Sequence, residues 1–207
     1  GKNKLLVQGA GGNVSWKINQ SLWVKASGRW MGKNIAKQET LFTCLKLGPN
    51  EYQKFSNNLN FKLELCDSAQ PRPSIETPFH ALLPQRIVCH LHEVRATSIL
   101  VQANAEAILS SLIPSDINWK LIPYVKPGIK LAQEVKLALI KNPTIDVYFL
   151  ANHGIIIVAE DVLSIEKKLL KVTDAVSAIT EKIIVSKTNP PELELINQMT
   201  KFKYNFL

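Results

Sequence analysis

Hydrophobic and polar positions follow two different periods along this chain and divide it into strand-like and helix-like segments. Short apolar runs or apolar–polar alternation, which are typical of strands, occur at 21–27, 61–66, 87–92, 119–125, 146–153 and 154–160. Apolar residues at helical spacing occur at 35–47, 77–84, 94–101, 104–112, 128–142 and 161–186. The last segment is clearly amphipathic, with Asp161 as its expected N-cap. The pattern predicts an α/β fold in which helices cover a sheet.

The chain shows no sign of division into several domains. No internal repeat, low-complexity tract or linker rich in glycine, proline or serine interrupts the 207 residues, so we expect a single domain over residues 1–207. No apolar run reaches the roughly 18 residues of a membrane span, and the N-terminal residues lack the apolar core of a signal peptide. The three cysteines lie within predicted strands and helices, which argues against a disulfide framework. We therefore expect a reducing, cytoplasmic setting.

The formal net charge of +8 comes from 25 Lys+Arg against 17 Asp+Glu. The basic residues are scattered, and no basic stripe with interleaved aromatic residues is present, so the charge does not predict a nucleic-acid partner. A basic balance also attracts phosphorylated metabolites. A lysine-rich solvated surface explains most of the charge, and we expect neither a nucleic-acid partner nor a membrane partner.

The segment "RIVCHLHEV" at 86–94 holds two of the chain's four histidines. Its β-branched and apolar residues predict a strand, and side chains two residues apart on a strand share a face, so His90 and His92 should point to the same side. Two such imidazoles can bind one metal ion, or they can be polar side chains that the core satisfies. His153 lies at the end of another predicted strand, directly before Gly154. Three imidazoles would leave an open coordination position, as in a catalytic zinc site.

Glu76, in "RPSIETPFH", lies on a backbone that Pro73 and Pro78 make stiff. A carboxylate beside a metal can act as a general acid or base. The alternative interpretation is a surface glutamate on a loop. His80, on the helical turn that follows, is expected at the surface or as a helix cap.

Two loops that contain glycine, "QGAGGNVSWK" at 8–17 and "KASGRW" at 25–30, can turn backbone N–H groups towards an anion. In the first loop, Asn13 and Ser15 add side-chain donors. That loop matches neither a Walker motif nor a dinucleotide fingerprint. Taken alone, both loops are also compatible with simple turns.

Six motifs follow one another along the chain: "GGNVS" (11–15), "VKASG" (24–28), "PSIETPFHALLP" (73–84), "VCHLH" (88–92), "IPYVKPG" (122–128) and "NHGIIIV" (152–158). In this order they resemble the class II aldolase/adducin family of metal-dependent sugar-phosphate aldolases. The first three are most similar to the aldolase module of bifunctional rhamnulose-phosphate aldolase/alcohol dehydrogenases. The resemblance implies a central, largely antiparallel β-sheet flanked by α-helices. It also implies a homotetramer with sites between subunits.

The resemblance further implies a role for each matching residue. His90, His92 and His153 would hold one Zn²⁺ per chain, and Glu76 would be the acid/base carboxylate. The residues that would bind the substrate phosphate are Gly12, Asn13, Ser27, Gly28 and Ser74. Tyr124 would reach the site of a neighbouring subunit, although a tyrosine here can equally be buried against a neighbouring strand. Ile75 departs from the family, because some relatives carry a second phosphate-binding serine there.

The activity implied by the resemblance is cleavage of a ketose phosphate to dihydroxyacetone phosphate and an aldehyde, through a zinc-stabilised enediolate. Epimerases, dehydratases and decarboxylases of the same fold would use the same metal. A non-catalytic binding module, as in the adducin heads that have lost the metal ligands, is an alternative of a different kind. Three histidines together with Glu76 favour an enzyme.

Overall fold

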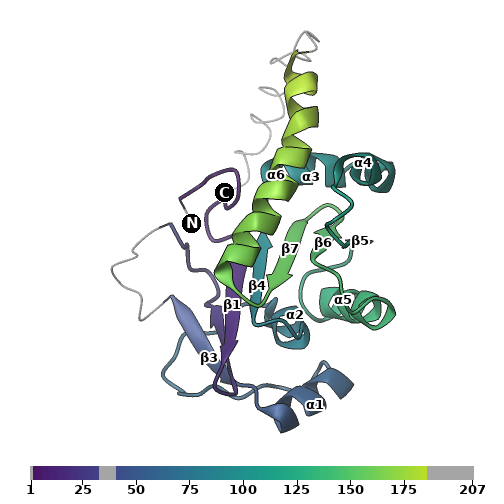
Figure 1. The fold of residues 1–207 in the computed structure, drawn as a ribbon. Helices are drawn as coiled ribbons and strands as arrows, with labels where there is room; N and C mark the ends of the chain where they lie inside the picture. Colours follow the sequence, from purple (N-terminus) through teal and green to yellow (C-terminus); the bar gives the residue numbers. More distant parts are fainter. Residues whose placement is uncertain (1, 33–40, 186–207) are drawn as a thin grey trace, which may run out of the picture. The chain divides into compact units, whose positions relative to one another are not determined.

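In the computed structural model, which describes residues 2–32 and 41–185, the central feature is a seven-stranded sheet within Gly1–Val176 (Figure 1). The strands are β1 (Asn13–Ile18), β2 (Ser21–Lys25), β3 (Phe42–Lys46), β4 (Ile87–Leu91), β5 (Trp119–Ile122), β6 (Val147–Leu150) and β7 (Gly154–Ala159). Their order across the sheet is β3-β2-β1-β4-β7-β6-β5, and each neighbouring pair is antiparallel except β5 and β6. The predicted α/β fold with a largely antiparallel sheet is confirmed.

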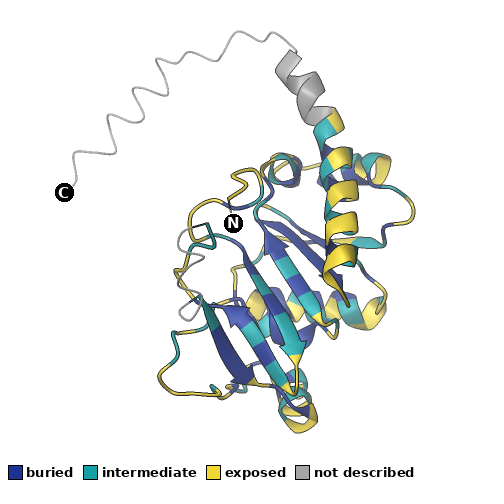
Figure 2. Cartoon of the chain, turned by 60° about the vertical axis from the view of Figure 1, so that its left-hand side comes forward, coloured by how far each residue is buried: buried dark blue, intermediate teal, exposed yellow. Residues whose placement is uncertain are grey.

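Helices pack against both faces of this sheet. They are α1 (Pro49–Asn57), α2 (Thr77–Leu82), α3 (Val94–Leu100), α4 (Ala105–Leu112), α5 (Ile129–Lys141) and α6 (Val162–Val185). On one face, α2 and α5 bury Phe79 and Leu131 in a core with β2 and β4, and α1 joins them. On the other face, α3, α4 and the part of α6 up to Val176 bury Ile99 and Val172 against β6 and β7. The strands are largely buried, whereas the helices expose their outer faces (Figure 2).

In the hairpin of β6 and β7, every residue of the two strands is buried. Both strands consist mainly of β-branched and aromatic residues, which suit a strand covered on both faces. Asn152, in the turn between them, has a φ of 55°, a left-handed conformation that asparagine tolerates better than most residues. The backbone N–H of His153 donates to the carbonyl oxygen of Leu150 (3.1 Å). This turn places His153 at the start of β7.

The prediction of a helix at 35–47 is wrong for Phe42–Lys46, which forms β3 and pairs with β2; residues 33–40 lie outside the described residues. Pairing along the edge of β2 and the strand preference of aromatic and β-branched residues outweigh the helical spacing of the leucines. Segment 61–66 forms an isolated bridge to Leu45 instead of a full strand.

β1 and α1 have no counterpart among the predicted elements. On β1, the polar residues Asn13 and Ser15 are buried, whereas Val14 and Trp16 on the opposite face are only partly buried. This is the reverse of the apolar-inside alternation by which a half-buried strand is recognised.

The other predicted strands and helices are present, and β5 ends at Ile122 instead of at residue 125. The carboxylate of Asp161 accepts a hydrogen bond from the backbone N–H of Ser164 (2.8 Å), as expected of an N-cap. Within the described residues, no helix has the length and apolar character needed to cross a membrane.

Candidate metal centre

Three histidines converge where the end of β4 meets the start of β7. His90 lies on β4, His92 follows that strand directly, and His153 immediately precedes β7. Because the two strands are antiparallel, with Leu91 opposite Ile155, the end of one lies beside the start of the other. One potential ligand atom from each histidine lies within 4.8 Å of those of the other two.

The hydrogen bond of His90 directs its ring towards this cluster. His90 Nδ1 lies 3.0 Å from the carbonyl oxygen of Ile155. A carbonyl oxygen can only accept, so Nδ1 carries the proton and Nε2 presents a lone pair, the arrangement common in metal-binding histidines. His90 Nε2 lies 3.2 Å from His92 Nε2. Nitrogens bound about 2.0–2.1 Å from one tetrahedral ion lie about 3.3 Å apart, so the two atoms fit as ligands of one ion.

Glu76 brings a buried carboxylate oxygen to the same cluster. It is the N-cap residue of α2, with 6% of its surface exposed, and is therefore not the surface glutamate of the alternative interpretation. Among the described residues its Oε1 has no hydrogen-bond donor, yet it lies 3.5 Å from His90 Nε2 and 3.3 Å from His153 Nε2. A buried acceptor without a donor is costly, and a cation held by the histidines would satisfy it.

The histidines are neutral because they are buried. Desolvation lowers the pKa of His90 to about 3. Desolvation, together with the neighbouring His90, lowers the pKa of His153 to about 4. Burial also lowers the pKa of His92, although the negative charge of Glu76 opposes this shift. Neutral imidazole is the form that binds metals, so the cluster offers three nitrogen donors at neutral pH, and the negative charge of Glu76 beside them favours a divalent cation.

The first glycine loop packs directly against these histidines. Gly12 has a φ of +63°, and a Cβ at this position would lie 2.8 Å from the carbonyl oxygen of His90. A Cβ on Gly11 would lie 2.7 Å from Nδ1 of His92. Both contacts are closer than a side chain allows. The glycines therefore make room for the histidine cluster, a role that the sequence did not indicate.

The second glycine loop lies beside the segment that carries Ser74. The backbone N–H of Ser27 donates to the carbonyl oxygen of Arg72 (2.9 Å). Gly28 has a φ of +69°, and both Ser27 and Gly28 are exposed. The structure thus brings Ser27 and Gly28 into a loop next to that of Ser74, which lies about 46 positions further along the chain.

Lys25 connects the two glycine loops. Its Nζ donates to the carbonyl oxygens of Ala10 (3.0 Å) and Arg29 (2.7 Å), and only 2% of the residue is exposed. Burial lowers the pKa of Lys25, and the carboxylate of Glu76 opposes this shift. The sequence did not point to this residue, although a lysine directly after the strand-like "SLWV" was an available signal.

The side chain of Asn13 is fully engaged within the protein. Its Nδ2 donates to Glu76 Oε2 (2.6 Å) and lies 3.2 Å from Ser74 Oγ, and its Oδ1 accepts from Nε2 of His80. His80 is completely buried, so its predicted place at the surface or as a cap is wrong. α2 is buried at nearly every position and carries His80 inwards, where Nδ1 meets Ser15 Oγ (2.7 Å). A single polar residue within the apolar run "FHALL" was the signal for this burial.

Tyr124 lies on the loop between β5 and α5, with 59% of its surface exposed. The alternative interpretation, a tyrosine buried against a neighbouring strand, is therefore wrong. An exposed phenol at this position is free to meet a group outside its own chain.

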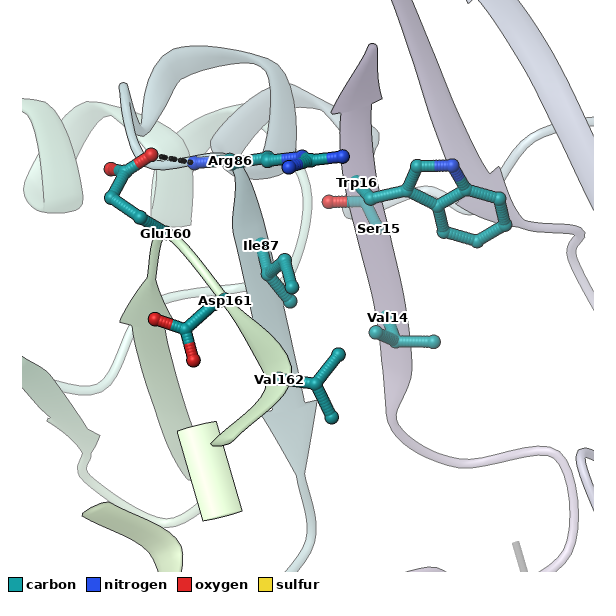
Figure 3. A pocket seen from close by; sticks show the side chains of 8 residues that line it. All are labelled: Val14, Ser15, Trp16, Arg86, Ile87, Glu160, Asp161 and Val162. Carbon is teal, nitrogen blue, oxygen red and sulfur yellow. Dashed lines mark hydrogen bonds between the residues drawn. The ribbon is translucent and has the colours of Figure 1, made fainter. Parts of the chain in front are cut away.

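A cavity of about 410 Å³ lies on the face of the sheet opposite to the side chains of Asn13 and His90 (Figure 3). It is lined by Val14 and Trp16, which alternate with the inward-facing residues of β1, and by the first residue of α6. Two further lining residues are joined by a hydrogen bond from the backbone N–H of Arg86 to Glu160 Oε2 (3.3 Å). Neither the three histidines nor Glu76 lines this cavity, so it is separate from the candidate metal centre.

Sequence comparison relates this chain to one family. Residues 2–177 match the family model described as "Class II Aldolase and Adducin N-terminal domain". The chain is also 29% identical, over 172 residues, to the "Uncharacterized oxidoreductase YuxG" of Bacillus subtilis (strain 168). This alignment covers 75% of the chain and 24% of the relative, so the chain spans about a quarter of that relative's length.

Solved structures share the fold. The N-terminal class II aldolase domain of a conserved protein from Thermoplasma acidophilum has a TM-score of 0.72 at 24% identity, covering 86% of this chain and 87% of that one. The sugar-phosphate aldolase from Thermotoga maritima has a TM-score of 0.69 at 13% identity, covering 88% and 90%. With the family match extending over residues 2–177, the chain belongs to the class II aldolase and adducin N-terminal domain family.

Proposed function

We propose that this protein is a metal-dependent aldehyde-lyase that cleaves a ketose phosphate into dihydroxyacetone phosphate and an aldehyde. The observation that carries the proposal is the convergence of three histidines with the buried Oε1 of Glu76, which accepts no hydrogen bond from the part of the chain that the structure describes. Membership of the family supports an enzyme of this kind, and a sugar-phosphate aldolase has the same fold. The much longer relative with an oxidoreductase name would agree with an aldolase domain that forms part of a bifunctional protein.

We propose Zn²⁺ as the cofactor, one ion per chain, held by His90, His92 and His153. Nitrogen ligands suit zinc, and neutral ligands leave most of its charge available. When bound, the ion would supply Lewis-acid stabilisation, worth several kcal/mol in typical sites, for the negative charge that develops on the substrate oxygens as the carbon–carbon bond breaks.

Glu76 would carry the proton to and from the substrate carbon. Its Oε2 is occupied by Asn13, which leaves Oε1 as the oxygen available for proton transfer. Its position as the N-cap of a helix with proline in the first turn restricts its movement. A restricted carboxylate keeps the geometry on which efficient proton transfer depends.

The substrate phosphate would bind to Gly12, Ser27, Gly28 and Ser74. The second glycine loop lies beside the segment of Ser74, which supports this, and the positive charge of Lys25, which is hydrogen-bonded to both glycine loops, favours an anion. A fixed phosphate determines which carbon of the sugar faces the metal. We propose a different role for Asn13 below, because its side-chain atoms are already hydrogen-bonded.

Tyr124 of a neighbouring subunit would accept the hydroxyl proton as the aldehyde leaves. Its exposure supports a function outside its own chain. We accordingly propose a homotetramer with sites between subunits, working in the cytoplasm, with the domain extending over residues 1–207.

An epimerase, dehydratase or decarboxylase would use the same ligands and the same Glu76, so the reaction has to be distinguished by its products. A non-catalytic module related to adducin would not require a complete donor set. The retained histidines and the buried carboxylate oxygen therefore favour catalysis.

The test begins with the metal content of the purified protein, measured by mass spectrometry beside His92→Ala and a control, Lys62→Ala, at an exposed position. We expect about one divalent ion per chain in the wild type and the control, and almost none in His92→Ala. A panel of phosphorylated ketoses and keto acids, with products identified, then tests for dihydroxyacetone phosphate. A wild type that binds no ion when offered zinc would overturn the proposal in favour of the adducin-like module. Epimerised, dehydrated or decarboxylated products would overturn it in favour of the related reactions.

A further inference from the structure

Behind Glu76 lies a continuous chain of buried hydrogen bonds that the proposed reaction does not use directly. It runs from Ser15 Oγ to His80 Nδ1 (2.7 Å), from His80 Nε2 to Asn13 Oδ1, and from Asn13 Nδ2 to Glu76 Oε2 (2.6 Å). The exposed fractions of the four residues are between 0% and 6%. We call these four residues the Glu76 support.

The direction of every hydrogen bond in the Glu76 support follows from its carboxylate end. An ionised carboxylate only accepts, so the amide of Asn13 must turn its NH₂ group to Glu76 and its carbonyl oxygen to His80. That oxygen also only accepts, so His80 must carry its proton on Nε2. The unprotonated Nδ1 then accepts from the hydroxyl of Ser15. Burial lowers the pKa of His80 well below its ordinary value, which agrees with a neutral ring.

The fold brings these residues together from two elements. Asn13 and Ser15 are two positions apart on β1 and therefore share a face, and Asn13 pairs with His90 of β4. Glu76 and His80 are four positions apart at the start of α2 and therefore share a side of the helix. The strand and the helix thus meet through polar side chains beside the metal-binding histidines.

We propose that His80, acting through Asn13, is a positioning residue that holds Glu76 with Oε2 bound and Oε1 directed at His90 and His153. This inference rests on the proposed function. Without the His80 donor, the amide of Asn13 is no longer held in one orientation, and its rotation would present an oxygen to the carboxylate. Glu76 would then lose its fixed direction towards the metal.

The experiment compares His80→Leu with His80→Gln, because the glutamine amide can still donate to Asn13 from a position near that of Nε2. Metal affinity is measured by competition with a chromophoric chelator. The values of kcat and KM are measured with the ketose phosphate that the wild type cleaves. We expect His80→Leu to weaken zinc binding by about 10-fold or more and to lower kcat with little change in KM. His80→Gln should stay within about threefold of the wild type. Circular dichroism and thermal unfolding establish that each variant is folded.

A folded His80→Leu protein with wild-type zinc affinity and kcat would overturn the positioning role. If the wild type binds zinc but cleaves no ketose phosphate, the proposed function fails, and the zinc affinities still decide the role of His80. If the wild type binds no zinc, the ring ¹⁵N chemical shifts of the four histidines show which nitrogen of His80 carries the proton. A proton on Nε2 of His80, with a shift that changes in Asn13→Leu, supports the hydrogen-bond chain, and a proton on Nδ1 overturns it.

A separate observation concerns two cysteines at the edge of the sheet. Leu45 of β3 forms an isolated antiparallel bridge with Leu65, which places Cys44 opposite Cys66. The backbone N–H of Cys66 donates to the carbonyl oxygen of Cys44 (2.9 Å), and their sulfur atoms lie 2.8 Å apart. Cys44 is buried and Cys66 is exposed. The sulfur of Cys66 is thus accessible to a reagent, and the sulfur of Cys44 lies next to it inside the protein.

The geometry points to a redox modification site at which Cys44 and Cys66 form a disulfide. A low-molecular-weight disulfide such as oxidised glutathione is the oxidant: the Cys66 thiolate attacks it and releases one reduced thiol. The Cys44 thiolate then attacks the mixed disulfide and releases the second, so two protein thiols are oxidised and one external disulfide is reduced. Cys66 is the first nucleophile because it is exposed, whereas Cys44 is buried and its burial raises its pKa to about 11.

The test incubates the wild type, Cys66→Ser and Cys89→Ser with oxidised glutathione and counts free thiols after denaturation. We expect two of the three thiols to disappear from the wild type, with a mass loss of about 2 Da and no glutathione adduct. Cys89→Ser should lose both of its remaining thiols, and Cys66→Ser should form no intramolecular disulfide. Closing this loop should raise the Tm by about 5–10 °C, reversibly with dithiothreitol. Retention of all three wild-type thiols, or a stable glutathione adduct at Cys66, would overturn the inference.

Discussion

β1 and β7 lie on either side of β4, and the faces that they turn towards α2 and α5 differ in chemistry. β7 presents Ile156 and Val158, whereas β1 presents Asn13 and Ser15. All four residues are at most 3% exposed. The two strands therefore differ in what they bury and not in how deeply they bury it.

This difference separates stability from orientation. Apolar surface contributes roughly 25 cal/mol for each Å² that is buried, so β7 stabilises the fold directly. A buried polar group contributes little net stability and costs about 1–3 kcal/mol when it is left unpaired. β1 instead uses its hydrogen bonds to orient Glu76. We therefore expect changes in β7 to lower the free energy of unfolding, and changes at the polar site to lower activity.

The largest expected effect is that of Glu76→Gln on activity. The amide keeps an acceptor for Asn13 but cannot exchange a proton with the substrate, so kcat should fall about 10²–10⁴-fold. The free energy of unfolding should change by less than about 1 kcal/mol. Release of dihydroxyacetone phosphate and urea unfolding measure the two quantities. Glu64→Gln, at an exposed side chain, is the matched control, and a Glu76→Gln variant with the kcat of that control would remove Glu76 from the chemistry.

The converse effect is expected for Ile157→Ala in β7. Ile157 is fully buried among the residues that pack beneath α3, α4 and α6, on the face opposite to His90. Removing its side chain should lower the free energy of unfolding by about 2–5 kcal/mol and leave zinc affinity unchanged. Val14→Ala, at a half-buried position on β1, should cost less. A loss of zinc affinity in folded Ile157→Ala would contradict the separation of stability from orientation.

The same contrast explains which parts of the fold were predictable from the sequence. β7 was recognisable because "GIIIVA" concentrates residues that favour a buried strand. β1 was not, because its buried positions are polar and are satisfied by partners more than 60 positions away, such as His80 and Glu76. β3 was mistaken for a helix because its apolar residues are compatible with both helical and strand spacing. Only its pairing with β2, a tertiary contact, distinguishes the two.

The candidate site was predictable to a similar degree. Strand periodicity indicated that His90 and His92 share a side, and the structure brings both of them and His153 together. No local pattern indicated that the glycines of the first loop leave space for these rings, because that contact depends on how β1 pairs with β4. His80 was misjudged for the same reason, since its burial depends on the sheet against which α2 packs.

The last expected effect, small over any single pH unit, distinguishes the two regions by pH. The pKa values of His90 and His153, about 3 and about 4, lie below the ordinary value of about 6.5, so between pH 6.5 and 4 the unfolded chain binds protons that the folded chain does not. Stability of the metal-free protein is therefore complete above about pH 6.5 and falls as the pH is lowered, by up to about 1.4 kcal/mol per pH unit for each histidine. Urea unfolding with a chelator at several pH values measures this slope. His153→Gln should reduce the slope by up to one proton, whereas Ile157→Ala should shift the whole curve downwards without changing its slope. Equal slopes in His153→Gln and the wild type would mean that burial does not hold this histidine neutral, and the contrast between an apolar strand and a polar site would lose its electrostatic part.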